Sequence, residues 1–260
     1  MVPITCRTEI TPLTILDITT LTIAAFFTSA LTAVAGAGGG AALMAIMLQF
    51  MPPVAAIPVH GAVHLVSNIT RCWLLWRHMS WPIIIRFAIP LPFGAVLGLW
   101  LFQGLSIETV QILIGAFVLL SLVSSQMQGF GGKELPLWGF VPVGFGAGIL
   151  NMIVGAIAPI LGVFVIRKDL TKENVVATLG FFGVVANIAK VTGFTVIGFS
   201  FVAYGPAVLC MIPAVIIGTR VGRALLHKVD ERLFLLIFKI ILMVLGLKLI
   251  LVDGMGLLDN

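Results

Sequence analysis

The sequence predicts an all-α fold, that of a polytopic integral membrane protein. Hydrophobic residues make up 60% of the 260 positions and charged residues only 10%, whereas a soluble chain carries about a quarter charged residues. The mean hydropathy is +1.19. One crossing takes about 20 apolar residues, so the chain has room for about eight to ten transmembrane helices and none for a folded aqueous domain. Continuous apolar runs such as 240–252 disfavour an outer-membrane barrel, whose strands alternate apolar and polar residues.

Ten apolar segments, separated by charged residues, proline and glycine, are each expected to be helical. The five in the first half are 13–35, 39–51, 53–76, 82–103 and 107–126. The five in the second half are 136–150, 152–166, 173–197, 201–226 and 232–252.

Most of the boundaries have a local cause in the sequence. The first segment ends in a run of glycines, the third begins at Pro53, and Trp81-Pro82 restarts the chain after the basic pair Arg77-His78. Segments 39–51 and 152–166 are short for a full crossing, so each is a tilted helix, a half-helix or a re-entrant segment. Glycines precede both short segments: Gly36, Gly38, Gly39 and Gly40 in the first half, and Gly144, Gly146 and Gly148 in the second.

A polar, glycine-bearing connector from Gln126 to Glu134 bisects the chain and indicates an internal repeat. The expected organisation is a first transmembrane repeat at 10–126, a linker at 127–135 and a second repeat at 136–252. A shift of 119 residues aligns four pairs of small or polar residues: Gly36 with Gly155, Gly61 with Gly180, Asn68 with Asn187, and Arg71 with Lys190. Farther on, Pro92-x5-Gly98 resembles Pro213-x4-Gly218 after a one-residue gap.

Basic residues gather in alternate loops if all ten segments cross the membrane. The crowded side holds Arg71, Arg77, His78, Arg86, Lys133, Arg167, Lys168, Lys172, Arg220, Arg223, Lys228 and Arg232. By the positive-inside rule this side is cytoplasmic, with both termini outside. Five segments per repeat is an odd number, so the halves run in opposite directions. Inverted repeats with short, glycine-interrupted segments are typical of secondary transporters.

A polar stripe marks the 53–76 helix. His60, His64, Ser67, Asn68 and Arg71 stand at i, i+4, i+7, i+8 and i+11, which places them on one helix face. Thr178, Gly183, Asn187 and Lys190 follow a similar line on the 173–197 helix. An ionised Lys deep in the bilayer costs several kcal/mol unless it is paired or hydrated, so we expect a buried anion or a water-filled cavity beside Lys190.

Carboxylates are missing at this depth, which favours an anionic substrate. Asp169 and Glu173 lie at the far end of the 173–197 segment. We expect Lys190 and Arg71 to bind the anion and Asn68 and Asn187 to donate hydrogen bonds to it. Backbone N–H groups and a helix N-terminus would contribute at four glycines, Gly38, Gly39, Gly40 and Gly155. His60 and His64 are candidates for proton coupling, because imidazole titrates near neutral pH.

Each assignment has a purely structural alternative. Arg71 is close enough to the membrane surface to snorkel, and Lys190 has backbone carbonyls within reach. The Asn pair and the glycines are also common at helix–helix contacts. His60 and His64 have the spacing of two metal ligands, but no third ligand or nearby carboxylate accompanies them, so no metal is expected.

At these residues the sequence resembles the sulfite exporter TauE/SafE family of small bacterial permeases for sulfur-containing anions. The likeness covers about 15 to 252. Its motifs are Gly36-Ala37-Gly38-Gly39-Gly40, Pro53-x-x-Ala56, the Asn near the end of the next helix, Arg77-His78 before Trp81-Pro82, Gly94 with Gly98, and Gly155-Ala156-Ile157-Ala158-Pro159. Family members often place Thr-Ser where this chain has His60-Gly61, and the second glycine motif has lost most of its glycines, so the substrate need not be sulfite itself.

The resemblance implies a permease for sulfite, thiosulfate or organosulfonates in the cytoplasmic membrane of a bacterium. We expect alternating access to a site between the two repeats, with a possible homo-oligomer, no cofactor and no nucleic-acid partner. The motif GxxxxGK[ST] is absent from the sequence, so energy has to come from a gradient. The alternatives are a passive anion channel, a membrane assembly subunit, or an intramembrane enzyme using His60 and His64.

Overall fold

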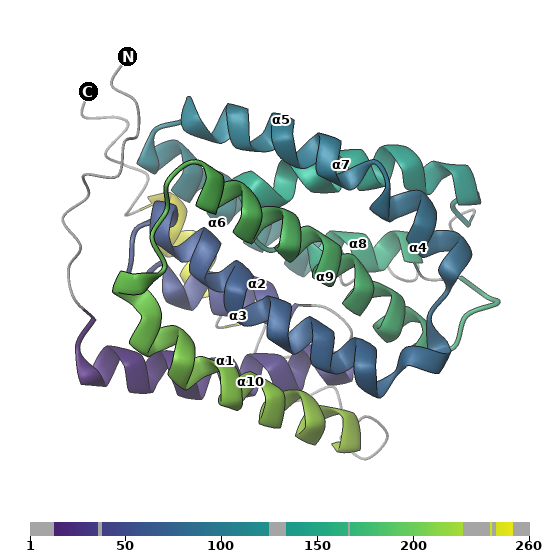
Figure 1. Ribbon diagram of the computed structural model, residues 1–260, viewed down its shortest axis with the longest axis horizontal. Coiled ribbons are helices and arrows are strands. Elements are labelled where there is room, and N and C mark those ends of the chain that lie inside the picture. The colour runs from purple at the N-terminus through teal and green to yellow at the C-terminus, as the bar shows by residue number, and fades with distance from the viewer. Residues whose placement is uncertain are drawn as a thin grey trace.

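The protein folds as a bundle of helices in which two central helices cross between two outer groups (Figure 1). The computed structural model describes residues 13–35, 38–124, 134–165, 167–225, 240 and 243–251. Within these ranges the regular structure is α-helix with short 3-10 turns and no strand, which confirms the all-α prediction. Gly36 and most of the predicted linker at 127–135 lie outside the described residues.

The α-helices of the first half are α1 (Ile15–Ala35), α2 (Gly39–Met47), α3 (Pro53–Leu74), α4 (Trp81–Ala88), α5 (Leu91–Gln103) and α6 (Ile107–Ser124). Those of the second half are α7 (Phe140–Ile153), α8 (Ala158–Val165), α9 (Lys172–Val196) and α10 (Gly205–Leu225). Three 3-10 turns lie at Trp76–His78, Leu137–Gly139 and Val202–Tyr204. Residues 243–251 are also helical.

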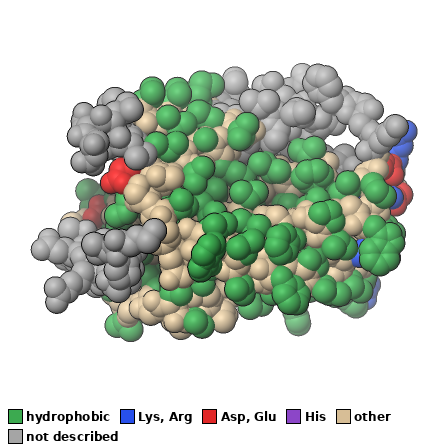
Figure 2. All heavy atoms as spheres, turned by 90° about the horizontal axis from the view of Figure 1, so that it is seen from above, with side chains coloured by type: hydrophobic (Ala, Val, Ile, Leu, Met, Phe, Trp, Pro, Cys, Tyr) green, Lys and Arg blue, Asp and Glu red, His purple; other side chains and the backbone are tan. Residues whose placement is uncertain are grey.

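Four stretches in the described part of the chain are long and apolar enough to cross a membrane. They are Ile15–Val34, Trp81–Gln103, Lys172–Val196 and Val202–Leu225. Large apolar side chains such as Trp100, Phe93 and Leu209 are exposed on their outer surfaces, and green hydrophobic side chains cover much of the face in Figure 2. Such a surface suits lipid contact. The prediction of eight to ten crossings is not tested by this finding.

The predicted segment 82–103 is present as one apolar stretch but contains a turn, and the predicted role of two glycines was wrong. The segment expected as one helix at 82–103 is divided into α4 and α5, because Pro90 has no backbone N–H to continue a helix and instead stands just before a new one. Gly144 and Gly148 do not open the short second-half segment. They lie inside α7, where added Cβ atoms would stand 2.2 Å from the carbonyl oxygens of Phe87 and Leu91.

The two halves pack on each other reciprocally. Helix α1 lies along α10, and α7 lies along α4 and α5 (Figure 1). Both contacts are close because glycines leave room for the neighbouring backbone. A Cβ on Gly218 would lie 2.3 Å from the Phe26 oxygen, and one on Gly94 would lie 1.9 Å from the Phe145 oxygen. The first helix of each half therefore packs against the fourth predicted segment of the other half.

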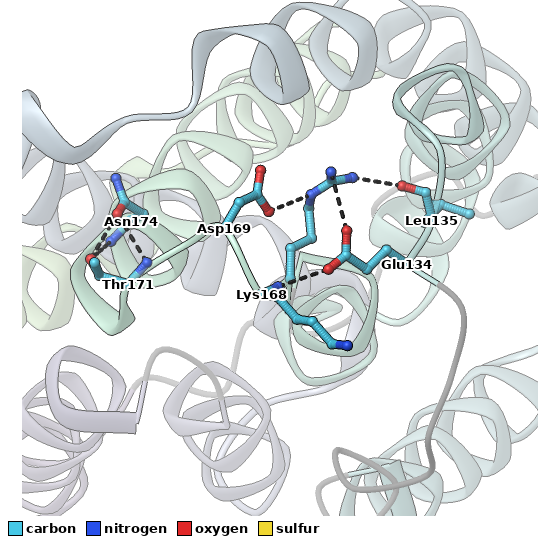
Figure 3. A network of polar contacts seen from close by, with 7 residues as sticks. Glu134, Leu135, Lys168, Asp169, Thr171 and Asn174 are labelled. Carbon is cyan, nitrogen blue, oxygen red and sulfur yellow. Dashed lines mark hydrogen bonds and ion pairs between the residues drawn. The ribbon is translucent and has the colours of Figure 1, made fainter.

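One end of the bundle gathers three loops into a polar network (Figure 3). Arg167 Nε contacts Asp169 at 3.0 Å, and its Nη1 donates to the Leu135 carbonyl at 2.9 Å. Asn174 Nδ2 donates to the His78 carbonyl at 2.8 Å. The hydrogen bond from Arg167 lowers the pKa of Asp169. The loops that follow α3, precede α7 and precede α9 therefore meet at one end of the molecule.

Basic side chains are concentrated at this end. Arg220 and Arg223 at the end of α10 lie beside Leu74 at the end of α3. The opposite end carries Asp17 and Glu108 near the starts of α1 and α6, and Lys248, which donates to Gln49. The two ends therefore differ in charge, and the cytoplasmic location of the basic end stays a prediction. Lys133, Lys228 and Arg232, which belonged to the same prediction, lie outside the described residues.

Candidate functional site

The candidate site lies where α3 and α9 cross in the middle of the bundle (Figure 1). The helices approach closely because glycines face long side chains. A Cβ on Gly61 of α3 would lie 2.8 Å from Lys190 Cδ, and one on Gly180 of α9 would lie 3.5 Å from Arg71 Cδ. An early residue of α3 thus meets a late residue of α9 and the reverse, so the two helices are antiparallel.

Three of the aligned pairs lie on α3 and α9, and the glycine of each helix faces the cation of the other helix. Each glycine accommodates the stem of the cation from the other half, and each cation bonds the Asn three residues before it. Arg71 Nη2 donates to Asn68 Oδ1 at 2.6 Å, and Lys190 Nζ donates to Asn187 Oδ1 at 3.2 Å. The same local arrangement therefore occurs once in each half of the chain.

Both cations are buried. The exposed fraction is 3% for Arg71 and 0% for Lys190. Snorkelling of Arg71 to the membrane surface is therefore wrong as an explanation of that residue. Lys190 also donates to the carbonyl oxygen of Gly155. This is a backbone contact of the kind that the structural alternative for Lys190 expected. The ion pairs found among the described residues belong to Arg167, and none of them includes Lys190.

A cavity lies against this crossing. A volume of about 40 Å³ is open to the centre of a water molecule, so there is room for several waters or one small anion. Its polar lining comes from six side chains and adjoining backbone: His60, His64, Asn68, Arg71, Asn151, Asn187, Gly40, Gly155 and Ala156. Thr32 and apolar residues such as Phe182 and Leu161 complete the wall. No carboxylate is found among these lining residues.

Two short helices begin beside the cavity. Gly38 and Gly155 have φ values of 100° and 80°, which glycine adopts without the steric cost of a side chain. Helix α2 starts one residue after Gly38, and α8 starts three residues after Gly155. The first N–H groups of a helix have no partner inside it and carry partial positive charge. Both short helices therefore begin with donors near the cavity.

The predicted glycines divide between two roles. Gly40 and Gly155 line the cavity. Gly39 instead packs against α1, where a Cβ would stand 1.9 Å from the Thr28 carbonyl oxygen. Gly38 supplies the bend before α2 and is absent from the lining. Lys190 is also absent from the lining, since its ammonium group is occupied behind Gly155 and Asn187.

His60 and His64 form a stacked pair on the cavity wall. Their ring centroids are 4.3 Å apart, and His60 Nε2 contacts the Gly40 carbonyl at 2.9 Å. A carbonyl only accepts, so Nε2 carries the hydrogen and Nδ1 is free to take up a proton. His60 Nδ1 and His64 Nε2 are buried without a hydrogen-bond partner in the described structure.

Sequence reasoning missed Asn151 and the two hydroxyl partners of Ser67. Asn151 of α7 donates to the Ala186 carbonyl at 2.8 Å and reaches the cavity. The sequence feature that could have identified Asn151 is a single amide side chain among apolar residues. Ser67 bonds both Ser29 and Thr219 at 3.0 Å and joins α3 to α1 and α10. Thr178 accepts from the Ser80 backbone N–H at 3.2 Å and serves the start of α4 rather than the site.

Comparison with known proteins gives one family. The model of the sulfite exporter TauE/SafE family matches residues 21–249, which include every residue of the cavity. No curated protein and no solved structure matches the chain.

Proposed function

The chain belongs to the sulfite exporter TauE/SafE family, and we propose on this premise that it is a secondary transporter that carries sulfite, thiosulfate or an organosulfonate by alternating access. Membership implies a multi-pass membrane protein that transports sulfur-containing anions. The choice among these anions, the transport cycle and a location in the cytoplasmic membrane of a bacterium are parts of the proposal.

One observation carries the assignment of the site. The cavity at the α3–α9 crossing is lined by Arg71 and by amide and imidazole groups, has Lys190 bonded behind its wall, and has no carboxylate in its described lining. A metal cation or an ammonium substrate needs oxygen acceptors in its site, whereas an oxyanion needs N–H groups and positive charge. The site therefore favours an anion.

The spacing of the donors suits a small oxyanion. Asn68 lies opposite Gly183, since a Cβ there would stand 2.2 Å from Asn68 Nδ2. Asn187 is four residues farther along α9, so the two amides are offset by about 6 Å along the helices. A tetrahedral or pyramidal oxyanion spans this offset with a different oxygen toward each amide. Arg71, which also lines the cavity, adds positive charge beside the same ligand.

The reciprocal packing of the halves supports the alternating-access part of the proposal. We infer that repeats at 10–126 and 136–252 rock against each other around the α3–α9 crossing. Each repeat contributes one pair of Asn and cation and one short helix to the site, and the second repeat adds Asn151. A rocking motion would open the cavity to one side of the membrane at a time, as in other transporters built from inverted repeats.

Proton coupling belongs to the same proposal. His60 and His64 line the cavity, and their buried atoms His60 Nδ1 and His64 Nε2 have no hydrogen-bond partner in the described structure. A proton taken up beside a bound anion neutralises part of its charge, which lowers the cost of moving it through the bilayer. The two histidines are therefore assigned the coupling step.

The test is transport of radiolabelled sulfite and thiosulfate by the purified protein in proteoliposomes. We expect a rate that saturates with substrate and rises when unlabelled substrate is present on the opposite side. A rate that grows linearly with concentration, with no trans-stimulation, would indicate the passive channel instead. No flux of any sulfur-containing anion above that of protein-free liposomes would contradict the proposed function.

A further inference from the structure

The two cavity amides are held in a way that determines which of their atoms meets a ligand. In each helix the cation three residues later donates to the Asn oxygen: Arg71 to Asn68, and Lys190 to Asn187. Guanidinium and ammonium groups have donors and no acceptor, so the contacted atom has to be the amide oxygen. The amide nitrogen, with its two N–H groups, is the polar atom left for the cavity.

We propose that Lys190 and Arg71 are positioning residues which lock Asn187 and Asn68 with their N–H groups toward the cavity, and that this lock makes the site selective for anions. The inference rests on the proposed function, because it assigns the cause of selectivity at the same site. An unlocked Asn side chain turns by 180° and offers either its oxygen or its nitrogen to a ligand. A locked one offers donors only, and an oxyanion accepts them while a cation does not.

The position of Lys190 agrees with an indirect role. Its side chain does not line the cavity, and its ammonium group bonds two oxygens, Asn187 Oδ1 and the Gly155 carbonyl. Both oxygens belong to residues that line the cavity. If these two oxygens had no donor, their negative partial charges would repel an anion in the cavity. Lys190 thus removes two acceptors from the site without approaching the ligand.

The lock is built twice in the same register. Gly61 leaves room for the Lys190 stem and Gly180 for the Arg71 stem, and in each half a glycine, an Asn and a cation recur at equal spacing. Packing alone requires a small residue at each crossing point and no particular cation. The recurrence of cation and amide together, three residues apart in both halves, is what the lock explains.

A double-mutant cycle tests the inference. Sulfite binding to the detergent-purified full chain is measured by calorimetry for wild type, Lys190→Met, Asn187→Leu and the double variant. Met keeps an unbranched stem and removes the ammonium group. In the wild-type background Lys190→Met should raise Kd about tenfold or more, the value of a hydrogen bond to a charged ligand. In the Asn187→Leu background the same change should raise Kd less than about threefold, because the amide it positions is gone.

Equal factors in the two backgrounds would mean that Lys190 acts on the anion independently of Asn187, and would overturn the inference. Lys190→Arg, which keeps a donor, should recover a large part of the affinity lost in Lys190→Met. Lys248→Met is the matched control, since Lys248 bonds Gln49 at the end of the bundle, and it should leave Kd unchanged. The cycle on Arg71→Met and Asn68→Leu repeats the test in the other half, and it replaces the first if Lys190→Met does not fold.

This experiment distinguishes a failure of the proposed function from a failure of the lock. A wild type that binds no sulfur-containing oxyanion contradicts the proposed function and the lock with it. A wild type that binds sulfite and shows additive effects in both cycles contradicts the lock alone.

Discussion

The residue that most narrowly limits the site is Gly183. It has no side chain where Asn68 extends its amide, and a Cβ there would lie 2.2 Å from Asn68 Nδ2 and 2.7 Å from Cγ. The amide has to move if any other residue stands at this position. The orientation of Asn68 toward the cavity therefore depends on a glycine of the other half.

Gly183→Ala should raise the Kd for sulfite about tenfold, because the displaced amide loses one hydrogen bond to the charged ligand. Calorimetry on the purified protein measures this. Gly146→Ala in α7 is the control, because a Cβ there would meet no atom within 4 Å. Equal Kd values for wild type and Gly183→Ala would show that Asn68 does not bind the anion.

His60 allows a separate test of coupling. Gln at this position retains an N–H for the Gly40 carbonyl, which His60 contacts at 2.9 Å, and it does not titrate. We expect His60→Gln to abolish the acceleration of transport by a pH gradient while exchange of anion for anion continues. Proteoliposome fluxes with and without the gradient measure both. An undiminished response to the gradient would remove His60 from the coupling step.

Much of the site could be predicted at this scale, and the reason is physical. A polar stripe on an apolar helix cannot face lipid, so Asn68, Arg71, Asn187 and Lys190 had to point inward. The partner of Lys190 could not be predicted, because Gly155 lies 35 residues away and reaches it only through the fold. The same holds for Asn151, whose acceptor is the carbonyl of Ala186 on another helix.

At the scale of the helices, close packing depends on glycines that line the contacts. In α7, Gly148 faces the backbone of α5, with a Cβ position 2.2 Å from the Leu91 oxygen, whereas Gly146 has no atom within 4 Å. The two glycines share one helix and differ only in what they face.

Gly148→Ala should destabilise the protein by about 1–3 kcal/mol, the usual cost of overpacking, because backbone cannot move aside as a flexible side chain does. Gly146→Ala should be neutral or stabilising by up to about 1 kcal/mol, since alanine is the better helix former. Thermal unfolding in detergent compares the two variants. A Tm for Gly148→Ala at or above that of Gly146→Ala would contradict the packing of α7 on α5.

The positions of the helices could be predicted from the apolar runs, but the positions of the breaks between them could not be predicted as well. Pro90 divides a segment that hydropathy treats as continuous, and its effect depends on whether the chain kinks or restarts there. Gly144 and Gly148 were predicted as the opening of a short helix because glycines have that role at Gly38. In α7 they serve helix contact instead, and the neighbour that decides this, α5, is distant in sequence.

At the scale of the whole molecule, the two halves differ in direction. Helices α1 and α10 are parallel, since Gly218 meets Phe26 and Gly222 meets Ala30. Helix α3 runs toward the basic end, and its counterpart α9 starts there. An inverted pair of repeats, which stays a prediction, would produce both facts, and a duplication would produce the register shift of 119 residues.

Sidedness tests this arrangement in cells. In a chain whose natural cysteines are replaced by serine, His78→Cys and Lys168→Cys should react only with a reagent that enters the cytoplasm. Ser106→Cys and Ser200→Cys, in exposed loops of the other end, should react with an impermeant maleimide from outside. Opposite sidedness of positions 78 and 168 would contradict the inverted repeats.

The central claim is that the cavity between α3 and α9 is the anion site. Calorimetric titration of the purified protein with sulfite tests it most directly, on the wild type and on Asn68→Leu/Asn187→Leu. The account predicts saturable binding to the wild type and a Kd at least about a hundredfold weaker in the double variant, from the loss of two charge-assisted hydrogen bonds. A double variant that folds and binds sulfite as tightly as the wild type would contradict it.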